Sequence, residues 1–159
     1  MSSAAPLSIF LASEQETARF GEWLAARLRP GDTLLLEGQI GAGKTHLARS
    51  LIRARLGRME DVPSPTFTLV QTYDAGDTEI WHADLYRLSH PDEVTELGLE
   101  AAFDTAICLI EWPDRLGSLA PPGAMRLQLS QEGEGRRLLV SGGRADLRAA
   151  IMQDWPADA

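Results

Sequence analysis

Apolar residues follow two patterns along this chain, short continuous runs and longer stretches with helical spacing. Runs typical of buried strands lie at residues 7–11, 33–37 and 106–110. Helical spacing follows a capping-box sequence at 13–16 and recurs at 47–52, before a glycine at position 57 that is expected to end the helix. A helix start at 89–93 and a final helix at 145–153 are also predicted.

Two pairs of segments are typical of antiparallel hairpins. Residues 67–73 and 78–84 flank the turn sequence Asp-Ala-Gly-Asp, and residues 126–131 and 137–141 flank a turn that contains glycine. Strands and helices otherwise interleave along the chain. We therefore expect an α/β fold with a mixed sheet, flanking helices and added antiparallel hairpins.

Length and composition favour one globular domain over residues 1–159, with a frayed tail at 154–159. The single cysteine, Cys108, excludes an intramolecular disulfide. The N-terminus lacks a signal-peptide pattern, and no stretch approaches the ~20 apolar residues of a membrane span. The net charge of −8 opposes non-specific binding to nucleic acid. We expect a cytoplasmic protein without membrane contacts that is monomeric when alone.

The sequence GQIGAGKT fits the phosphate-loop pattern Gly-x-x-x-x-Gly-Lys-Thr between a predicted strand and a predicted helix. Glycines let successive backbone N–H groups approach phosphate oxygens, and the helix N-terminus adds the positive end of its dipole. The lysine supplies a compact charge for the β- and γ-phosphates, and the threonine hydroxyl is a ligand of Mg²⁺. The pattern therefore predicts a P-loop NTPase-like sheet and these phosphate-binding residues: Gly38, Gly41, Ala42, Gly43, Lys44 and Thr45.

Besides the threonine hydroxyl, a P-loop site needs a carboxylate to hold Mg²⁺ and a group that positions the nucleophile. Glu111 follows a buried apolar run, where α/β sheets place ligands, so we expect it to be a Mg²⁺ ligand; a solvated strand end is the alternative. Asp84 ends another strand, with His82 two residues earlier on the same face. We interpret Asp84 as the residue that positions the attacking water or a Mg²⁺-bound water, with a turn-capping aspartate as the alternative.

Two further residues near these segments have two interpretations each. Thr66 lies in a Ser-Pro-Thr loop, where a threonine can sense the γ-phosphate and switch conformation on hydrolysis, or can be an ordinary turn residue. Trp112 follows Glu111 beyond the buried strand, where it is either an exposed contact for a partner or a packing residue.

Charge is segregated along the chain. Between Asp74 and Asp104, nine acidic residues stand against one arginine, Arg87, a balance equal to the net charge of the whole chain. Residues 43–58 are basic and contain no acids, so the P-loop is expected to lie in a basic neighbourhood. This segregation suits electrostatic steering toward a partner; a solvated acidic helix face is the alternative. The basic stretch also holds the only lysine of the chain, Lys44.

Five segments together resemble the bacterial TsaE (YjeE) family: EGQIGAGKT, SPTFTLV, HADLYRL, ELGLEAAF and ICLIEWP. The resemblance extends over residues 13–140 and implies a small ATPase that uses ATP and Mg²⁺ and is required for threonylcarbamoyladenosine modification of tRNA. It also implies binding to the TsaB–TsaD heterodimer, whose TsaD subunit carries out the transfer, so that tRNA is reached only indirectly. Hydrolysis is then weak without the partners and resets the complex between turnovers.

The same resemblance assigns roles to individual residues. Lys44 and Thr45 are the phosphate and Mg²⁺ residues, and Glu111 is a Mg²⁺ ligand. Thr66 falls in the switch-like segment, and Asp84 belongs to the HxDLYR element. The family's late position close to the nucleotide is Arg136 in this sequence. The sequence departs from the family pattern at Gln39, His46 and Pro63.

Three other functions also start from a P-loop. A small-molecule or nucleoside kinase needs an acceptor pocket and an arginine-rich lid, and the arginines at positions 115 and 126 are too scattered for one. A GTPase usually carries an Asn/Thr-Lys-x-Asp element, which cannot exist in a chain whose only lysine is Lys44. A non-catalytic scaffold, in which ATP occupancy alone drives assembly, remains the main alternative.

Overall fold

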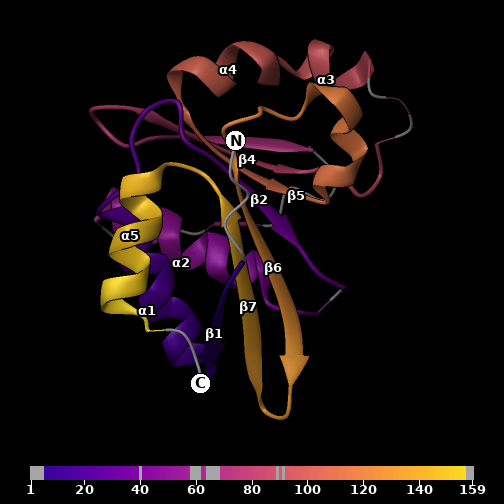
Figure 1. Ribbon diagram of the computed structural model, residues 1–159. Helices are drawn as coiled ribbons and strands as arrows, with labels where there is room; N and C mark the ends of the chain where they lie inside the picture. The colour runs from indigo at the N-terminus through magenta and orange to yellow at the C-terminus, as the bar shows by residue number, and fades with distance from the viewer. Residues whose placement is uncertain are drawn as a thin grey trace.

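A mixed sheet runs through the part of the chain that the computed structural model describes, residues 6–39, 41–57, 62–63, 69–88, 90 and 92–156. Its strand order is β1-β7-β6-β2-β5-β4-β3 (Figure 1). The strands are β1 (Leu7–Leu11), β2 (Thr33–Glu37), β3 (Val70–Asp74), β4 (Glu79–Asp84), β5 (Ile107–Glu111), β6 (Met125–Glu132) and β7 (Gly135–Gly142). The central strands β6, β2, β5 and β4 are parallel, whereas β3–β4, β6–β7 and β1–β7 are antiparallel pairs. The α/β fold with added hairpins is therefore confirmed.

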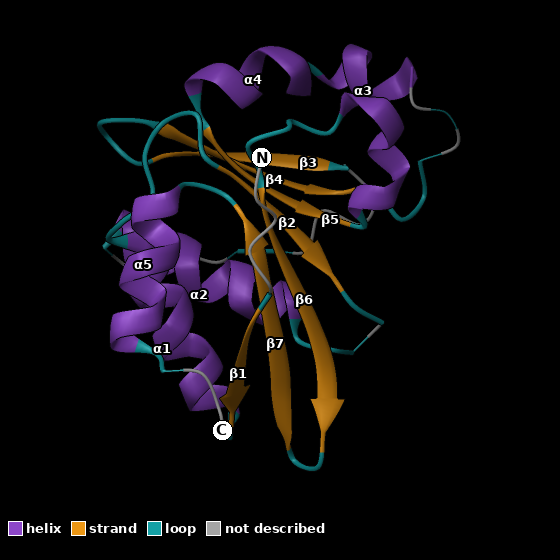
Figure 2. Cartoon of the chain, viewed as in Figure 1, coloured by secondary structure: helices purple, strands orange, loops and turns teal. Residues whose placement is uncertain are grey.

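Helices cover both faces of this sheet (Figure 2). One face carries α1 (Glu14–Ala25), α2 (Lys44–Leu56) and α5 (Ala145–Asp154). The other carries α3 (Asp92–Leu97), α4 (Leu99–Thr105) and the 3₁₀ helix η1 (Pro113–Leu119). The capping prediction for α1 is confirmed, because the Glu16 amide donates to Ser13 Oγ at 3.2 Å. The short elements α4 and η1 were not anticipated, because neither spans enough turns to show a clear helical period.

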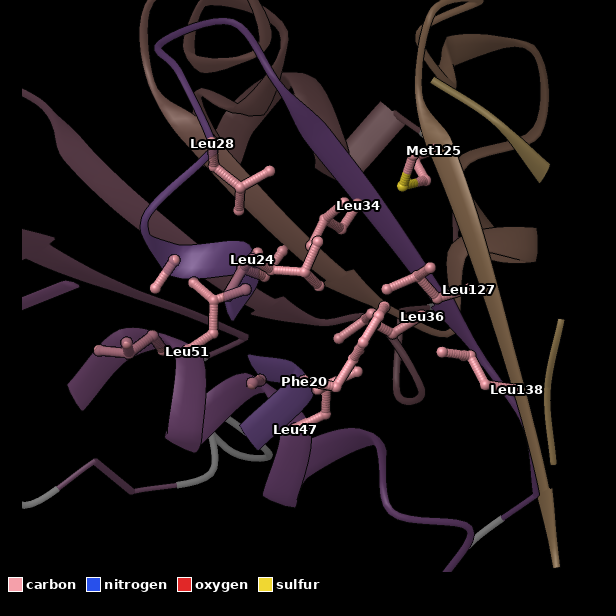
Figure 3. Packing of buried hydrophobic residues seen from close by; sticks show 14 of the residues in the cluster. Phe20, Leu24, Leu28, Leu34, Leu36, Leu47, Leu51, Met125, Leu127 and Leu138 are labelled. Atoms are coloured by element: carbon pink, nitrogen blue, oxygen red, sulfur yellow. The ribbon is translucent and has the colours of Figure 1, made fainter. Parts of the chain in front are cut away.

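The larger core lies between α1, α2, α5 and the sheet (Figure 3). Phe20 of α1 is fully buried among leucines from α1 and α2 and from the strands β2, β6 and β7. On α2, Leu47 and Leu51 face inward, and Leu36 of β2 lies opposite them in the same cluster. This packing fixes α2 along β2, so that the N-terminus of the helix stands beside the C-terminal ends of β5 and β4.

The first residues of the C-terminal tail make contacts with α1. Asp154 is the last residue of α5 and accepts a hydrogen bond from the Trp23 indole at 2.8 Å. Trp155 packs edge-on against Phe20, with ring centroids 5.2 Å apart. The aromatic ring buries more apolar surface in this position than in solvent, which holds the chain end on α1.

Of the described helices, none has the length and apolar character to cross a bilayer.

Candidate functional site

The P-loop connects β2 to α2, and its backbone depends on glycine. Gly38, Gly41 and Gly43 have φ angles of 142°, 84° and 107°, in the region that residues with a Cβ rarely adopt. Gly38 is also sterically enclosed, because a Cβ at this position would lie 2.4 Å from the carbonyl oxygen of Leu129 in β6. The loop conformation therefore depends on close contact with β6.

Substituting alanine for Gly38 is expected to destabilise the fold by about 3 kcal/mol, because backbone strain and overlap with the Leu129 carbonyl act together. Urea unfolding of the variant measures this loss. The matched control is Gly76→Ala in the β3–β4 turn, where φ is 89° and no atom lies within 4 Å of the added Cβ. The control is expected to lose only about 1 kcal/mol, from strain alone. Equal losses in the two variants would contradict the role of the β6 contact.

The carboxylate of Glu111 joins three elements beside the P-loop. Its Oε1 accepts a hydrogen bond from the Thr45 hydroxyl at 2.9 Å, and its Oε2 lies 2.7 Å from Nε2 of His82. Glu111 is 2% exposed and His82 is fully buried. The structure thus brings together the two residues predicted to hold Mg²⁺, at the first turn of α2 and the end of β5.

Asp84 lies beside Glu111, because these last residues of β4 and β5 are partners in the parallel register. Its side chain is buried, and Oδ1 accepts the backbone N–H of Tyr86 at 3.1 Å. The turn-capping interpretation therefore holds for this oxygen. Oδ2 makes no hydrogen bond to any residue that the structure describes, and Asp84 lines the pocket above the P-loop. One carboxylate oxygen thus stabilises the turn while the other is available to the pocket.

Lys44 is held within the site by its own surroundings. Its ammonium group donates to the carbonyl oxygen of Gly38 and lies 3.6 Å from the ring centroid of Trp112. The ring of Tyr86 packs against the Trp112 ring, with centroids 4.8 Å apart. Burial lowers the pKa of Lys44, and the negative charges of Glu111, Asp84 and Asp114 offset part of this effect. The ammonium group is therefore poorly hydrated, which favours its transfer to an anionic ligand.

Because Lys44 is the only lysine, acylation offers a direct probe of this group. A lowered pKa leaves more neutral amine at a given pH, so the pH profile of Lys44 labelling is expected to have a midpoint below 10.5. Peptide mass spectrometry across the pH range measures the profile, and Lys44→Arg, which leaves only the N-terminal amine, is the control. Mg·ATP is expected to protect the side chain. A midpoint at or above 10.5, or labelling unaffected by nucleotide, would contradict this prediction.

Arg136 holds the P-loop from the side of the β6–β7 hairpin. Its Nε donates to the carbonyl oxygen of Ala42 at 2.8 Å, and its terminal nitrogens donate to Gly41 at 3.3 Å and Gly135 at 2.9 Å. A Cβ added at Gly43 would lie 3.5 Å from Nε of Arg136, so the arginine side chain passes close to this part of the loop. Arg136 therefore contacts the backbone of the P-loop. The family resemblance predicted only that this residue lies close to the nucleotide.

A pocket of about 500 Å³ opens over these groups. Its charged lining residues are Glu14, Lys44, Asp84, Arg87, Glu111 and Arg136. The expected basic neighbourhood is wrong, because no arginine of α2 lines this pocket. Arg49 donates to the Val62 carbonyl, and Arg55 pairs with Asp77 at 3.1 Å.

The protein groups suit Mg²⁺, which usually takes one or two protein oxygens and completes its shell with phosphates and water. No cluster of three or more His, Cys, Asp or Glu side chains suited to a metal occurs among the described residues. The Thr45 hydroxyl and the Glu111 carboxylate, already 2.9 Å apart, supply the two oxygens that such a site needs.

Not every predicted site residue can be located. Thr66, with the rest of the Ser-Pro-Thr segment, lies outside the described residues. His82 had no predicted role, although its position two residues before Asp84 on the same strand face is visible in the sequence.

The sheet order and the loop between β2 and α2 define an α/β protein of the P-loop NTPase-like class. The family model described as "Threonylcarbamoyl adenosine biosynthesis protein TsaE" matches residues 11–139. The chain therefore belongs to the TsaE family, whose members take part in the biosynthesis of threonylcarbamoyladenosine in tRNA.

Individual relatives agree with this assignment. The protein named tRNA threonylcarbamoyladenosine biosynthesis protein TsaE from Rickettsia felis is 40% identical, over 82% of this chain and 76% of its own. Proteins of the same name from Bacillus subtilis and Haemophilus influenzae are 35% and 33% identical, over 77% and 83% of this chain and 77% and 87% of theirs. The crystal structure of Bacillus subtilis YdiB, at 24% identity, superposes with a TM-score of 0.77 over 96% of this chain and 95% of the other, and shares the fold.

Proposed function

We propose that this protein is a Mg²⁺-dependent ATPase that acts on the TsaB–TsaD heterodimer during threonylcarbamoyladenosine modification of tRNA. The observation that carries the proposal is the hydrogen bond of 2.9 Å between Thr45 and Glu111 at the mouth of the P-loop. A P-loop threonine beside an acidic residue at the end of a neighbouring strand is the arrangement with which P-loop NTPases hold Mg²⁺. The family assignment supplies the tRNA pathway.

The chemistry follows from the groups around the loop. Backbone N–H groups of the P-loop and the N-terminus of α2 bind the phosphates, and Lys44 exchanges the Gly38 carbonyl for β- and γ-phosphate oxygens. When bound, Mg²⁺ neutralises charge on the same oxygens. Oδ2 of Asp84 accepts a hydrogen bond from the attacking water and orients it toward the γ-phosphorus, while Oδ1 stays fixed by the Tyr86 amide. The water oxygen bonds to phosphorus as the bond to the ADP oxygen breaks, and the proton of the water passes to a phosphate oxygen, so that ADP and hydrogen phosphate leave.

A second candidate is the ATP-gated scaffold without catalysis. The hydrogen bond from the Tyr86 amide to Asp84 favours it, because this bond gives Asp84 a structural role that needs no water. Both functions require nucleotide to bind. They differ in what happens when the Asp84 charge is removed and nucleotide still binds: the ATPase loses its function, whereas the scaffold keeps it.

Hydrolysis by the isolated protein is expected to be slow and to rise at least tenfold when TsaB and TsaD are added. The physical reason is that Lys44 and Trp112 contact each other at the pocket, so that a partner can favour the arrangement in which Lys44 contacts phosphate. Phosphate release with each partner separately and with both together measures the effect. A pull-down with and without ATP shows whether the complex forms. Equal rates with and without the heterodimer would remove the partner-dependent mechanism.

A further inference from the structure

His82 is the most deeply buried titratable group next to the candidate Mg²⁺ ligands. The side chain lies on β4 and is 0% exposed, and its Nε2 is 2.7 Å from Oε2 of Glu111. Its other ring nitrogen, Nδ1, has no hydrogen-bond partner in the described part of the chain. A buried imidazole with one nitrogen that makes no hydrogen bond is unfavourable in free energy. The one polar contact that His82 does make therefore needs an explanation.

The contact has a defined direction. A carboxylate only accepts hydrogen bonds, so the proton between the two groups belongs to Nε2 of His82. Glu111 then accepts from His82 at Oε2 and from Thr45 at Oε1, and both oxygens are fixed. Without His82 the carboxylate would have one hydrogen bond and an apolar surface behind it, because Ile80 and Leu109 occupy the same side of the sheet.

We propose that His82 is a positioning residue that holds Glu111 with Oε1 directed toward Thr45 and the Mg²⁺ position. Partners of this kind orient metal-binding side chains, and their loss typically weakens metal binding 10- to 100-fold. The proposal rests on the proposed Mg²⁺ site, and it assigns the positioning to Nε2 alone, since Nδ1 makes no hydrogen bond to any residue in the described ranges.

Two substitutions separate the ring nitrogens. The amide nitrogen of His82→Gln reaches the position of Nε2, whereas the shorter side chain of His82→Asn reaches only that of Nδ1. Calorimetric titration with the non-hydrolysable analogue AMPPNP, in excess Mg²⁺ and in EDTA, gives the gain in affinity that Mg²⁺ provides. His82→Asn is expected to reduce this gain 10- to 100-fold and to leave the affinity in EDTA unchanged within twofold. His82→Gln is expected to retain most of the gain.

Controls separate positioning from stability. Leu147→Ala, on the buried face of α5, is expected to lower the melting temperature and to leave the Mg²⁺-dependent gain unchanged. If His82→Asn fails to fold, His82→Met, which has similar volume and no donor, replaces it in the comparison. An Asn or Met variant with the gain of the unmodified protein would overturn the proposal, and so would a loss in the Gln variant equal to that in the Asn or Met variant. A failure of the proposed Mg²⁺ site would instead remove the gain from the unmodified protein.

Discussion

Lys44→Ala is expected to lower the affinity for Mg·ATP at least about 100-fold, equivalent to about 2.8 kcal/mol at 1.4 kcal/mol per tenfold change. Lys44 supplies the only side-chain ammonium group in the protein. Its burial means that much of the cost of removing its water is incurred before ligand arrives. Calorimetric titration with AMPPNP and Mg²⁺ measures the change.

The fold itself is expected to survive this substitution. Removal of a poorly hydrated charge relieves a desolvation cost, so the melting temperature of Lys44→Ala is expected to stay the same or rise. Lys44→Arg is the matched control, since it keeps the charge but replaces a compact ammonium with a planar guanidinium group. Its affinity for Mg·ATP is expected to lie between those of the unmodified protein and Lys44→Ala. An affinity of Lys44→Ala within threefold of the unmodified protein would rule out the assigned phosphate site.

Asp84→Asn is expected to reduce partner-stimulated ATP hydrolysis 10²- to 10⁴-fold, the usual contribution of a group that assists the nucleophile. Asparagine keeps an oxygen for the Tyr86 amide, so the turn after β4 is preserved and the substitution removes the charge alone. Phosphate release in the presence of TsaB and TsaD measures the rate, and AMPPNP titration is expected to show an affinity within a few-fold of the unmodified protein.

The same residue distinguishes the ATPase from the scaffold. If ATP occupancy alone drives assembly, Asp84→Ala retains full tRNA modification as long as ATP binds, whereas Lys44→Ala abolishes it. If hydrolysis resets the complex, both variants lose modification over repeated turnovers. Normal hydrolysis by Asp84→Asn would remove Asp84 from the catalytic group.

The elements on either side of the P-loop sequence could be predicted from local spacing alone. The P-loop, the strand before it and the glycine that ends α2 are set by neighbouring residues, so their pattern is visible in one dimension. Position in space was harder to derive. Arg55 is close to Lys44 in sequence, but eleven residues of helix separate them by about 16 Å, and it pairs with Asp77 at the far end.

The contacts that organise the site also join segments far apart in sequence. Thr45 and Glu111 are 66 residues apart, and His82 and Glu111 are 29 apart. The sheet order that places β5 between β2 and β4 is what brings them together, and no local pattern encodes that order. The roles of Glu111 and Asp84 were predicted from strand ends, but the Thr45 and His82 partners of Glu111 could be identified only from the folded chain.

The hold of Arg136 on the P-loop has a consequence for synthesis of the protein. The arginine follows Ala42 by 94 residues, and β6, whose Leu129 carbonyl closes on Gly38, also lies in the last third of the chain. A nascent chain that has emerged as far as β5 already carries the complete phosphate-loop sequence, but it lacks the strand and the side chain that shape it. Fragments that end before β6 are therefore expected to carry that sequence without the ability to bind nucleotide tightly.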